Sequence, residues 1–225
     1  MGTGAPQTFR IPLILMAMAN LALLGKRLWP WQDVLNLPLN GATGIDPAIA
    51  LLGYIGLLFW MGGSRVRTTR AALFSATLLG LLGGALLAAH VALEVRPGSD
   101  AMPHFRLVGW GLLAAAALVW GFAGSQGTKA DGDAIMGLIA GAWSAMTSCL
   151  IAFTAVLVEM SMTAPAQVTT DPWKQYEGLA IGNTVTQSLV NSLNVGLTFL
   201  LVGPLVGLAL GLIFGLMSHS ESPKH

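Results

Sequence analysis

Apolar residues along the chain gather in long uncharged runs, which short polar segments separate. A bilayer core about 30 Å thick needs about 20 apolar residues in a helix. The pattern predicts an all-α fold, a polytopic membrane protein with about six transmembrane helices and long C-terminal helices. The predicted spans are residues 11–29, 47–63, 71–93, 107–124, 133–162 and 195–217. An alternative has five spans and a re-entrant or interfacial C-terminal piece.

The first predicted span is the weakest of the six. Its apolar run ends at Leu24, and Lys26 and Arg27 follow at once. Their long side chains can extend to the membrane interface. A secretory signal is the alternative, because Arg10 precedes the apolar stretch. The small residues of a cleavage site, Ala17-Met18-Ala19, lie inside that stretch instead of after it, which favours a retained span.

The composition agrees with the membrane prediction and excludes several classes of protein. Hydrophobic residues make up 54% of the chain and charged residues 9%, against about 25% charged in soluble domains. The mean hydropathy is +0.70. The single cysteine, Cys149, excludes an internal disulfide framework. A net charge of +1 gives no reason to expect nucleic acid as a partner. The expected surroundings are a lipid bilayer.

The arginines predict how the chain is oriented. Arg65, Arg67 and Arg70 lie in one short loop between the second and third spans. Short loops rich in Lys and Arg stay in the cytoplasm, so alternation places both termini on the cytoplasmic side. The Ala/Gly/Leu-rich composition favours a bacterial inner membrane, by analogy alone.

The two C-terminal segments are longer than a bilayer requires. Residues 133–162 would form a helix about 45 Å long, and residues 172–217 one of about 69 Å. Tilt alone does not absorb such lengths. Either these helices project beyond the outer surface, or the last one breaks. Gly182 and Gly196 are possible break points, and Pro204 can kink the later part.

The stretch 172–194 is amphipathic and continues into the last span. Its uncharged polar residues fall within about 80° of a helical wheel. They are Asn183, Gln187, Asn191, Asn194 and Thr198, called here the polar stripe. The stretch can lie flat in the interface, stand outside the membrane as half of a helical hairpin, or line a wet path. Interfacial helices usually carry Lys or Arg on the polar face, and the stripe has none.

Small residues at four-residue spacing are the sharpest pattern in the chain. They predict close packing of the last span against 133–162, or against its own copy in a neighbouring subunit. This spacing occurs in Gly203, Gly207, Gly211 and Gly215, and again in Gly137, Gly141 and Ala145. The pattern is specific for close helix packing and says little about activity.

Ionisable residues at the predicted outer ends of the spans are the candidate chemistry. His90 and Glu94 are one helical turn apart, and His104 and Glu159 lie at the same predicted level. A histidine and carboxylates that meet can ligate a metal. The simpler interpretation, which we favour, is that these residues hydrogen-bond to one another and to water at the interface.

The favoured function is a non-catalytic one. The chain carries no zinc-protease, nucleophile-elbow or phosphate-loop motif, and nothing in it requires a cofactor. We expect an integral membrane subunit or scaffold, which packs with itself as a homo-oligomer or with other subunits of a membrane complex. The first alternative is a small-solute channel or transporter lined by the polar stripe. The second is a membrane enzyme or a metal or redox component that uses the outer-face His and Glu residues.

Overall fold

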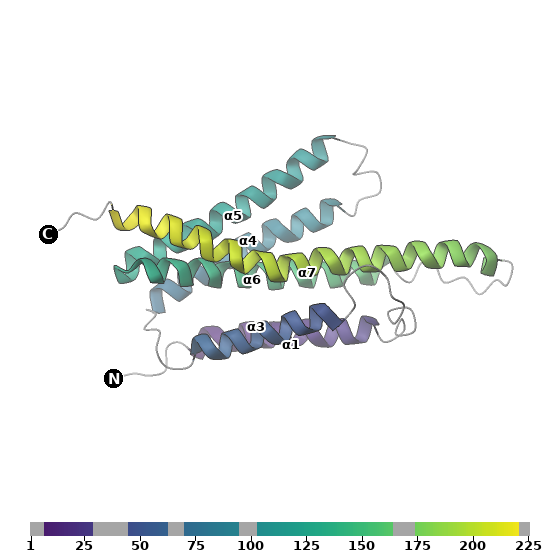
Figure 1. Cartoon of the computed structure of the whole chain (residues 1–225), viewed down its shortest axis with the longest axis horizontal. Coiled ribbons are helices and arrows are strands. Elements are labelled where there is room, and N and C mark those ends of the chain that lie inside the picture. The colour runs from purple at the N-terminus through teal and green to yellow at the C-terminus, as the bar shows by residue number, and fades with distance from the viewer. Residues whose placement is uncertain (1–6, 29–44, 63–69, 95–102, 164–173, 221–225) are drawn as a thin grey trace.

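The structure, a computed structural model, describes residues 7–28, 45–62, 70–94, 103–163 and 174–220. This part of the chain is helical and contains no strand, as the sequence predicts (Figure 1). Its six helices are α1 (Gln7–Leu28), α3 (Ile45–Gly62), α4 (Arg70–Glu94), α5 (Pro103–Asp131), α6 (Ala134–Thr163) and α7 (Lys174–Ser220).

Four of these helices, rather than the predicted six, are long and apolar enough to cross a bilayer. Their spans are Ala71–Glu94, His104–Asp131, Ala134–Ser161 and Ser192–Ser220. The chain is therefore a membrane-type all-α protein. The structure supports four spans instead of six, since the described apolar part of α3, Asp46–Phe59, is shorter than a span. In α1, charged and polar residues such as Arg10, Asn20 and Lys26 dilute the apolar run.

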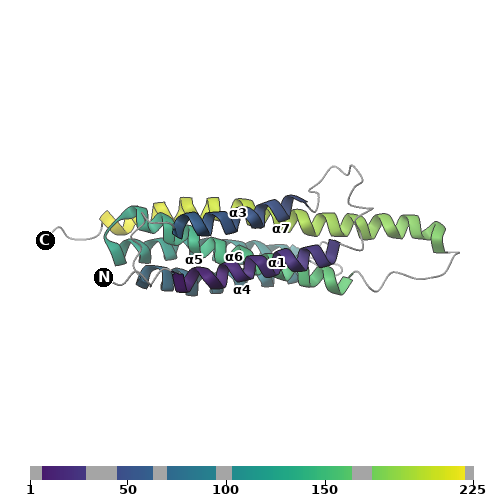
Figure 2. The same cartoon turned by 90° about the horizontal axis from the view of Figure 1, so that it is seen from below.

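The four long helices form a bundle, and α6 lies at its centre. Inside the bundle, 78% of the apolar window of α6 is buried, against 28–39% for the other three. The helices α1 and α3 lie side by side and pack on the α6 and α7 face of the bundle (Figures 1 and 2). Large apolar side chains such as Leu107, Phe59 and Leu205 are exposed around the outside, as expected for surfaces that face lipid.

Small and hydroxyl-bearing residues explain why α6 occupies the centre. Every residue from 139 to 150 is buried, and the small ones among them let neighbouring helices approach closely. Hydrogen bonds then tie α6 to its neighbours. Trp143 Nε1 donates to Thr77 Oγ1 of α4 at 3.0 Å, and Ser148 Oγ donates to the Gly80 carbonyl at 2.9 Å.

The helix α1 is joined to α6 by a buried amide. Asn20 Nδ2 donates to the Leu150 carbonyl at 3.1 Å, and Thr154 Oγ1 donates to Asn20 Oδ1 at 2.9 Å. Tyr54 makes the corresponding link from α3, since its hydroxyl donates to the Leu200 carbonyl of α7 at 2.8 Å. Each of these polar groups lies in an apolar setting where a hydrogen-bonding partner is needed.

The helices α5 and α6 are joined by a tight turn, which fixes how they cross. Gly132 has a positive φ of 72°, a conformation that favours glycine. Its amide donates to the Thr128 carbonyl at 2.7 Å and closes the end of α5. Asp133 then begins α6, because its carboxylate accepts from the Ile135 amide at 3.0 Å.

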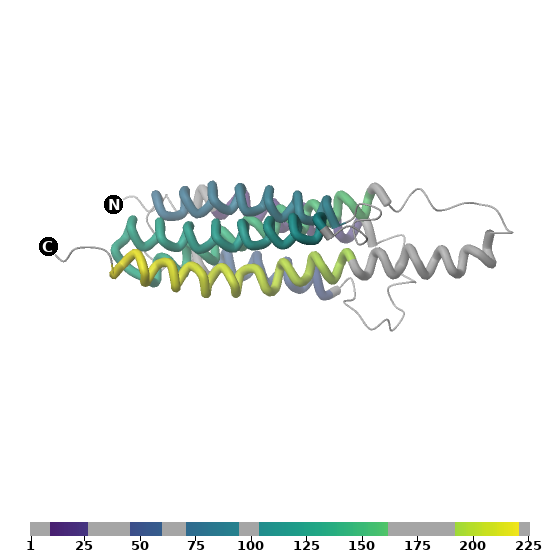
Figure 3. Tube along the Cα trace, turned by 90° about the horizontal axis from the view of Figure 1, so that it is seen from above, coloured from purple at the N-terminus to yellow at the C-terminus, as the bar shows by residue number. Residues whose placement is uncertain are grey.

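The last helix is continuous. α7 runs for 47 residues with Pro204 inside it, and it does not break at Gly182 or Gly196. Its length is about 70 Å, more than twice the hydrocarbon thickness. The described apolar span of this helix is Ser192–Ser220, and a helix of this length extends beyond the hydrocarbon region. Figure 3 traces the described end of α7 along the bundle.

Candidate functional site

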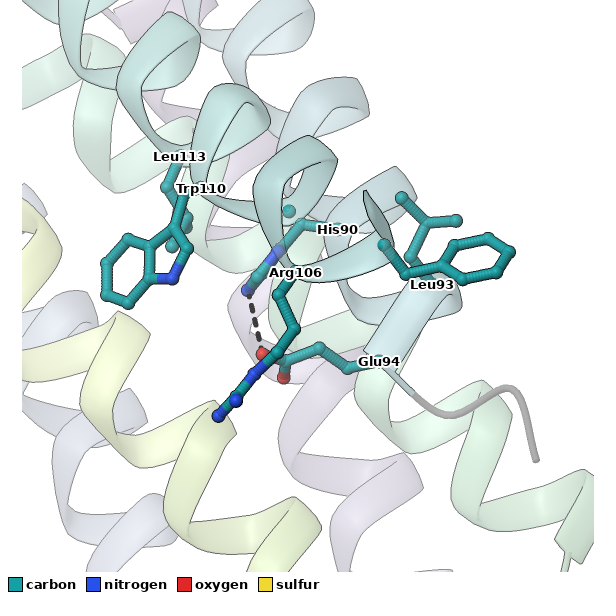
Figure 4. Close-up of a pocket in the computed structure, with 8 residues that line it drawn as sticks. His90, Leu93, Glu94, Arg106, Trp110 and Leu113 are labelled. Atoms are coloured by element: carbon teal, nitrogen blue, oxygen red, sulfur yellow. Dashed lines mark ion pairs between the residues drawn. The ribbon is translucent and has the colours of Figure 1, made fainter. Parts of the chain in front are cut away.

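A cavity of about 360 Å³ opens between the end of α4 and the beginning of α5. We call it the α4–α5 pocket (Figure 4). It is lined by His90, Leu93, Glu94, Phe105, Arg106, Gly109, Trp110 and Leu113. Such a volume is near the lower end of the range for ligand sites, and here it combines charged, aromatic and aliphatic side chains.

On the α4 side, the pocket is built on the pair His90 and Glu94. One helical turn separates them, and His90 Nε2 lies 3.4 Å from Glu94 Oε1. The side chain of His90 is 7% exposed and that of Glu94 is 53% exposed. The imidazole packs edge-on against the ring of Phe199 of α7, with the ring centroids 6.2 Å apart. The buried imidazole therefore holds its place while the carboxylate reaches into the opening.

Helix α5 approaches the imidazole through a glycine. A Cβ added at Gly109 would lie 3.1 Å from His90 Nδ1, so the missing side chain leaves room for the ring. Nδ1 is buried and has no hydrogen-bond partner. Buried polar atoms without a partner are rare and call for an explanation.

On the α5 side, the pocket presents Arg106 and Trp110, which are again one turn apart. Arg106 is exposed, and Trp110 is 71% exposed. Figure 4 shows the guanidinium extending past the carboxylate of Glu94, with the ion pair drawn only between His90 and Glu94. Tryptophan and arginine at the end of a span are typical of the boundary between lipid and water.

Of the four residues proposed as a weak metal set, the pocket contains two. His90 and Glu94 line it, whereas His104 is exposed and lies beside the ring of Phe105 at 4.7 Å. Glu159 of α6 is half-buried and lies within electrostatic range of Glu94. In the described part of the chain, no three His, Cys, Asp or Glu side chains gather as a metal site would require.

Sequence reasoning missed Arg106 and Trp110. Both lie in the first turns of α5, which begins at Pro103, whereas the predicted span begins at residue 107. Arg106 and Trp110 have the same i, i+4 spacing as His90 and Glu94, and this spacing was the only sequence feature that could have identified them. It indicates a shared site only if the end of α4 and the beginning of α5 face each other.

The polar stripe is described only at its C-terminal end. The side chains of Asn183, Gln187 and Asn191 lie outside the described residues. Asn194 is half-buried and Thr198 is exposed; the Thr198 hydroxyl donates to the Asn194 carbonyl at 2.8 Å. On the other side of α7, Leu193 and Leu200 are fully buried in the same apolar cluster as Phe153 of α6.

At the opposite end of the bundle, α5, α6 and α7 meet backbone to backbone. We call this contact the glycine interface. It is formed by Gly124, Gly137, Gly141, Gly207, Gly211 and Gly215. A Cβ added at Gly211 would lie 2.6 Å from the carbonyl oxygen of Gly137, and one at Gly207 would lie 2.8 Å from that of Gly141. Any side chain there would displace a backbone.

The two outermost glycines of the spacing pattern lie closest to side chains instead of backbone. Gly203 faces the side chain of the buried Cys149, and Gly215 faces Thr128 of α5, whose Oγ1 would lie 2.6 Å from an added Cβ. The pattern thus serves contacts within one chain over its whole length. Since α5 takes part through Gly124, three helices rather than two share the interface.

Comparison of the chain with known protein families, with curated proteins and with solved structures finds no match.

Proposed function

We propose that the chain is a non-catalytic integral membrane subunit or scaffold, and that α7 presents its polar stripe to another subunit of a membrane complex. In this proposal, both termini lie on the cytoplasmic side of a bacterial inner membrane. The arginines between α3 and α4 support that orientation. The N-terminal part of α7 then lies on the outer side of the membrane, and α1 and α3 pack beside the four-helix bundle.

The observation that carries the proposal is the continuity of α7. The helix extends from Lys174 to Ser220 without a break, and its 47 residues are far more than a bilayer requires. At its other end, the glycine interface holds it against two neighbours, because Gly207 and Gly211 contact α6 and Gly211 also contacts α5. A helix fixed in this way at its base is a rigid support for residues 174–191.

The described end of the polar stripe favours a partner over a solute path. Leu193 and Leu200 direct the apolar side of α7 into the bundle, while Thr198 is exposed. A helix turns by about 100° per residue, and on a helical wheel the other stripe residues fall within about 80° of one another together with Thr198. A path through the bundle would need the opposite orientation.

The chemistry of the stripe indicates the kind of partner. Amide side chains such as Asn183, Gln187 and Asn191 recognise other amides, hydroxyls or free backbone groups through hydrogen bonds. A helix from a different membrane protein fits best, because the glycine interface is already occupied within the chain and is not free for a second copy. Such an association is expected to be insensitive to salt, since no charge takes part.

Mild-detergent capture of the natively expressed, tagged protein tests the proposal. The triple variant N183L/Q187L/N191L is compared with wild type, and H219L/S220L is the control at the exposed far end of α7. We expect stoichiometric partners in wild type and in the control, and about a tenfold loss in the triple variant, as for the loss of a few hydrogen bonds. Equal recovery from all three proteins would overturn the proposal. If the tagged chain captures only untagged copies of itself, the hetero-complex is wrong and the protein forms a homo-oligomer.

A further inference from the structure

The α4–α5 pocket lies at the ends of two apolar helices that are long enough to cross a bilayer, and lipid head groups are expected at such ends. The spans of α4 and α5 end at Glu94 and begin at His104, so the pocket borders the hydrocarbon region. Trp110 and the neighbouring Leu107, which is 75% exposed, continue from the opening along the outside of α5. A ligand that reaches the pocket from the membrane would keep hydrocarbon chains on this apolar surface.

The positive and negative charges of the pocket lie on different helices. Arg106 supplies a guanidinium on α5, and Glu94 supplies a carboxylate on α4, with Glu159 of α6 within electrostatic range. A guanidinium matches a phosphate through paired hydrogen bonds, and a carboxylate accepts hydrogen bonds from an ammonium group. A purely anionic head group would meet the carboxylates, and a purely cationic one would meet Arg106.

We propose that the α4–α5 pocket binds the zwitterionic head group of a phosphatidylethanolamine-type phospholipid. The phosphate lies on Arg106, and the ammonium lies on Glu94. The lipid chains follow Leu107 and the indole of Trp110 toward the bilayer centre. This binding is independent of what the polar stripe of α7 contacts.

His90 acts as a positioning residue in this site. Its Nε2 lies 3.4 Å from Glu94 Oε1, and the ring is held between Phe199 and the backbone at Gly109. The imidazole therefore holds the Glu94 carboxylate from one side through Oε1. The exposed part of the Glu94 side chain faces the ligand. The buried ring itself offers the lipid no accessible nitrogen at Nδ1.

Lipid retention tests the proposal directly. The full chain is reconstituted with equal amounts of phosphatidylethanolamine, phosphatidylcholine and phosphatidylglycerol of matched chain length. It is then extracted in mild detergent, and the retained lipids are counted by mass spectrometry. We expect phosphatidylethanolamine to exceed each of the others at least about fivefold, as one or two charge-assisted hydrogen bonds allow. The quaternary ammonium of phosphatidylcholine has no N–H to donate.

Two variants and two matched controls identify the site. R106Q is expected to lower the retention of all three phospholipids, because each carries the phosphate. E94Q is expected to remove the preference for phosphatidylethanolamine over both of the others. K129Q and D133N make the same chemical changes on exposed residues at the other end of α5 and at the start of α6, and both should behave as wild type. Asparagine at position 133 still caps α6.

The results of this experiment distinguish a membrane phospholipid from a water-soluble ligand. Equal phospholipid retention by R106Q and K129Q would overturn the proposal, as would equal retention of phosphatidylethanolamine and phosphatidylcholine by the wild-type chain. Soluble phosphoethanolamine is added in the same experiment as a competitor. If the free head group displaces the lipid at millimolar concentration, the pocket serves a water-soluble ligand and the lipid proposal is wrong.

Discussion

The two ends of α5 differ in what they do for the molecule. Near its C-terminal end, α5 carries small residues, and Gly124 lies against the backbone of Gly211. Near its N-terminal end, it carries Arg106 and Trp110, and Figure 1 shows this end diverging from α7. Small residues let helices touch, while large ones hold them apart and leave a cavity. One helix therefore closes the bundle at one end and opens a pocket at the other.

Filling the glycine interface should have the largest effect on the fold. In G211L, the new Cβ would lie 2.6 Å from the Gly137 carbonyl oxygen and 3.0 Å from Gly141 Cα. Neither backbone can move without separating α6 from α7. We expect a loss of about 3 kcal/mol or more in the free energy of unfolding, measured by denaturant titration in detergent micelles or nanodiscs.

The matched control for this change is G111L on α5. Gly111 is exposed, and no atom would lie within 4 Å of an added Cβ. Its free energy of unfolding should stay within about 0.5 kcal/mol of wild type. Similar losses in both variants would mean that the glycine interface does not hold the three helices together.

A smaller change at the same end uses alanine on α5 alone. In G124A, the added methyl would meet the Gly211 backbone, with the Gly211 carbonyl oxygen 2.6 Å away. Overpacking costs about 1–3 kcal/mol, and the higher helix propensity of alanine offsets about 1 kcal/mol of it. We expect a net loss of up to about 2 kcal/mol, whereas G111A, which gains the same propensity without a contact, should be neutral or slightly more stable.

The packing of α7 illustrates what could be read from the sequence. Four-residue spacing of Gly203 to Gly215, matched by Gly137 and Gly141, predicts a smooth helix face, and its two named partners were α6 or a second copy of α7. Choosing between them needs the three-dimensional arrangement, as does the part played by Gly124 of α5. The sequence also does not show that a polar residue such as Asn20 is satisfied by α6.

The candidate site was predictable only in part. His90 and Glu94 attract attention because ionisable residues in an apolar run are costly, and helical spacing places them on one face. The sequence does not specify how the beginning of α5 lies relative to the end of α4, so nothing linked Arg106 and Trp110 to the α4 pair. The polar stripe has a clear periodicity, but periodicity alone does not say whether the stripe faces a partner, a pore or water.

The middle of α5 separates the two ends and is fixed by one hydrogen bond. Trp120 is buried, and its Nε1 donates to Ser148 Oγ of α6 at 3.0 Å. In W120F, this bond and some buried area are lost, for an expected cost of about 1 kcal/mol. W110F, at an exposed tryptophan of the pocket, should change the free energy of unfolding by less than about 0.5 kcal/mol. Equal costs would mean that burial does not distinguish the two positions.

The smallest effect is expected where α5 borders the pocket. In G109A, the new methyl would lie 3.1 Å from His90 Nδ1, which is a side-chain atom rather than backbone. The imidazole borders a cavity of about 360 Å³, so it can shift by a few tenths of an ångström. The helix propensity of alanine supplies about 1 kcal/mol in return, and the net change should be close to zero. Unfolding of G109A beside G124A measures this directly. If the two variants lose equal stability, the pocket end is packed as tightly as the glycine interface, and the contrast between the two ends of α5 does not hold.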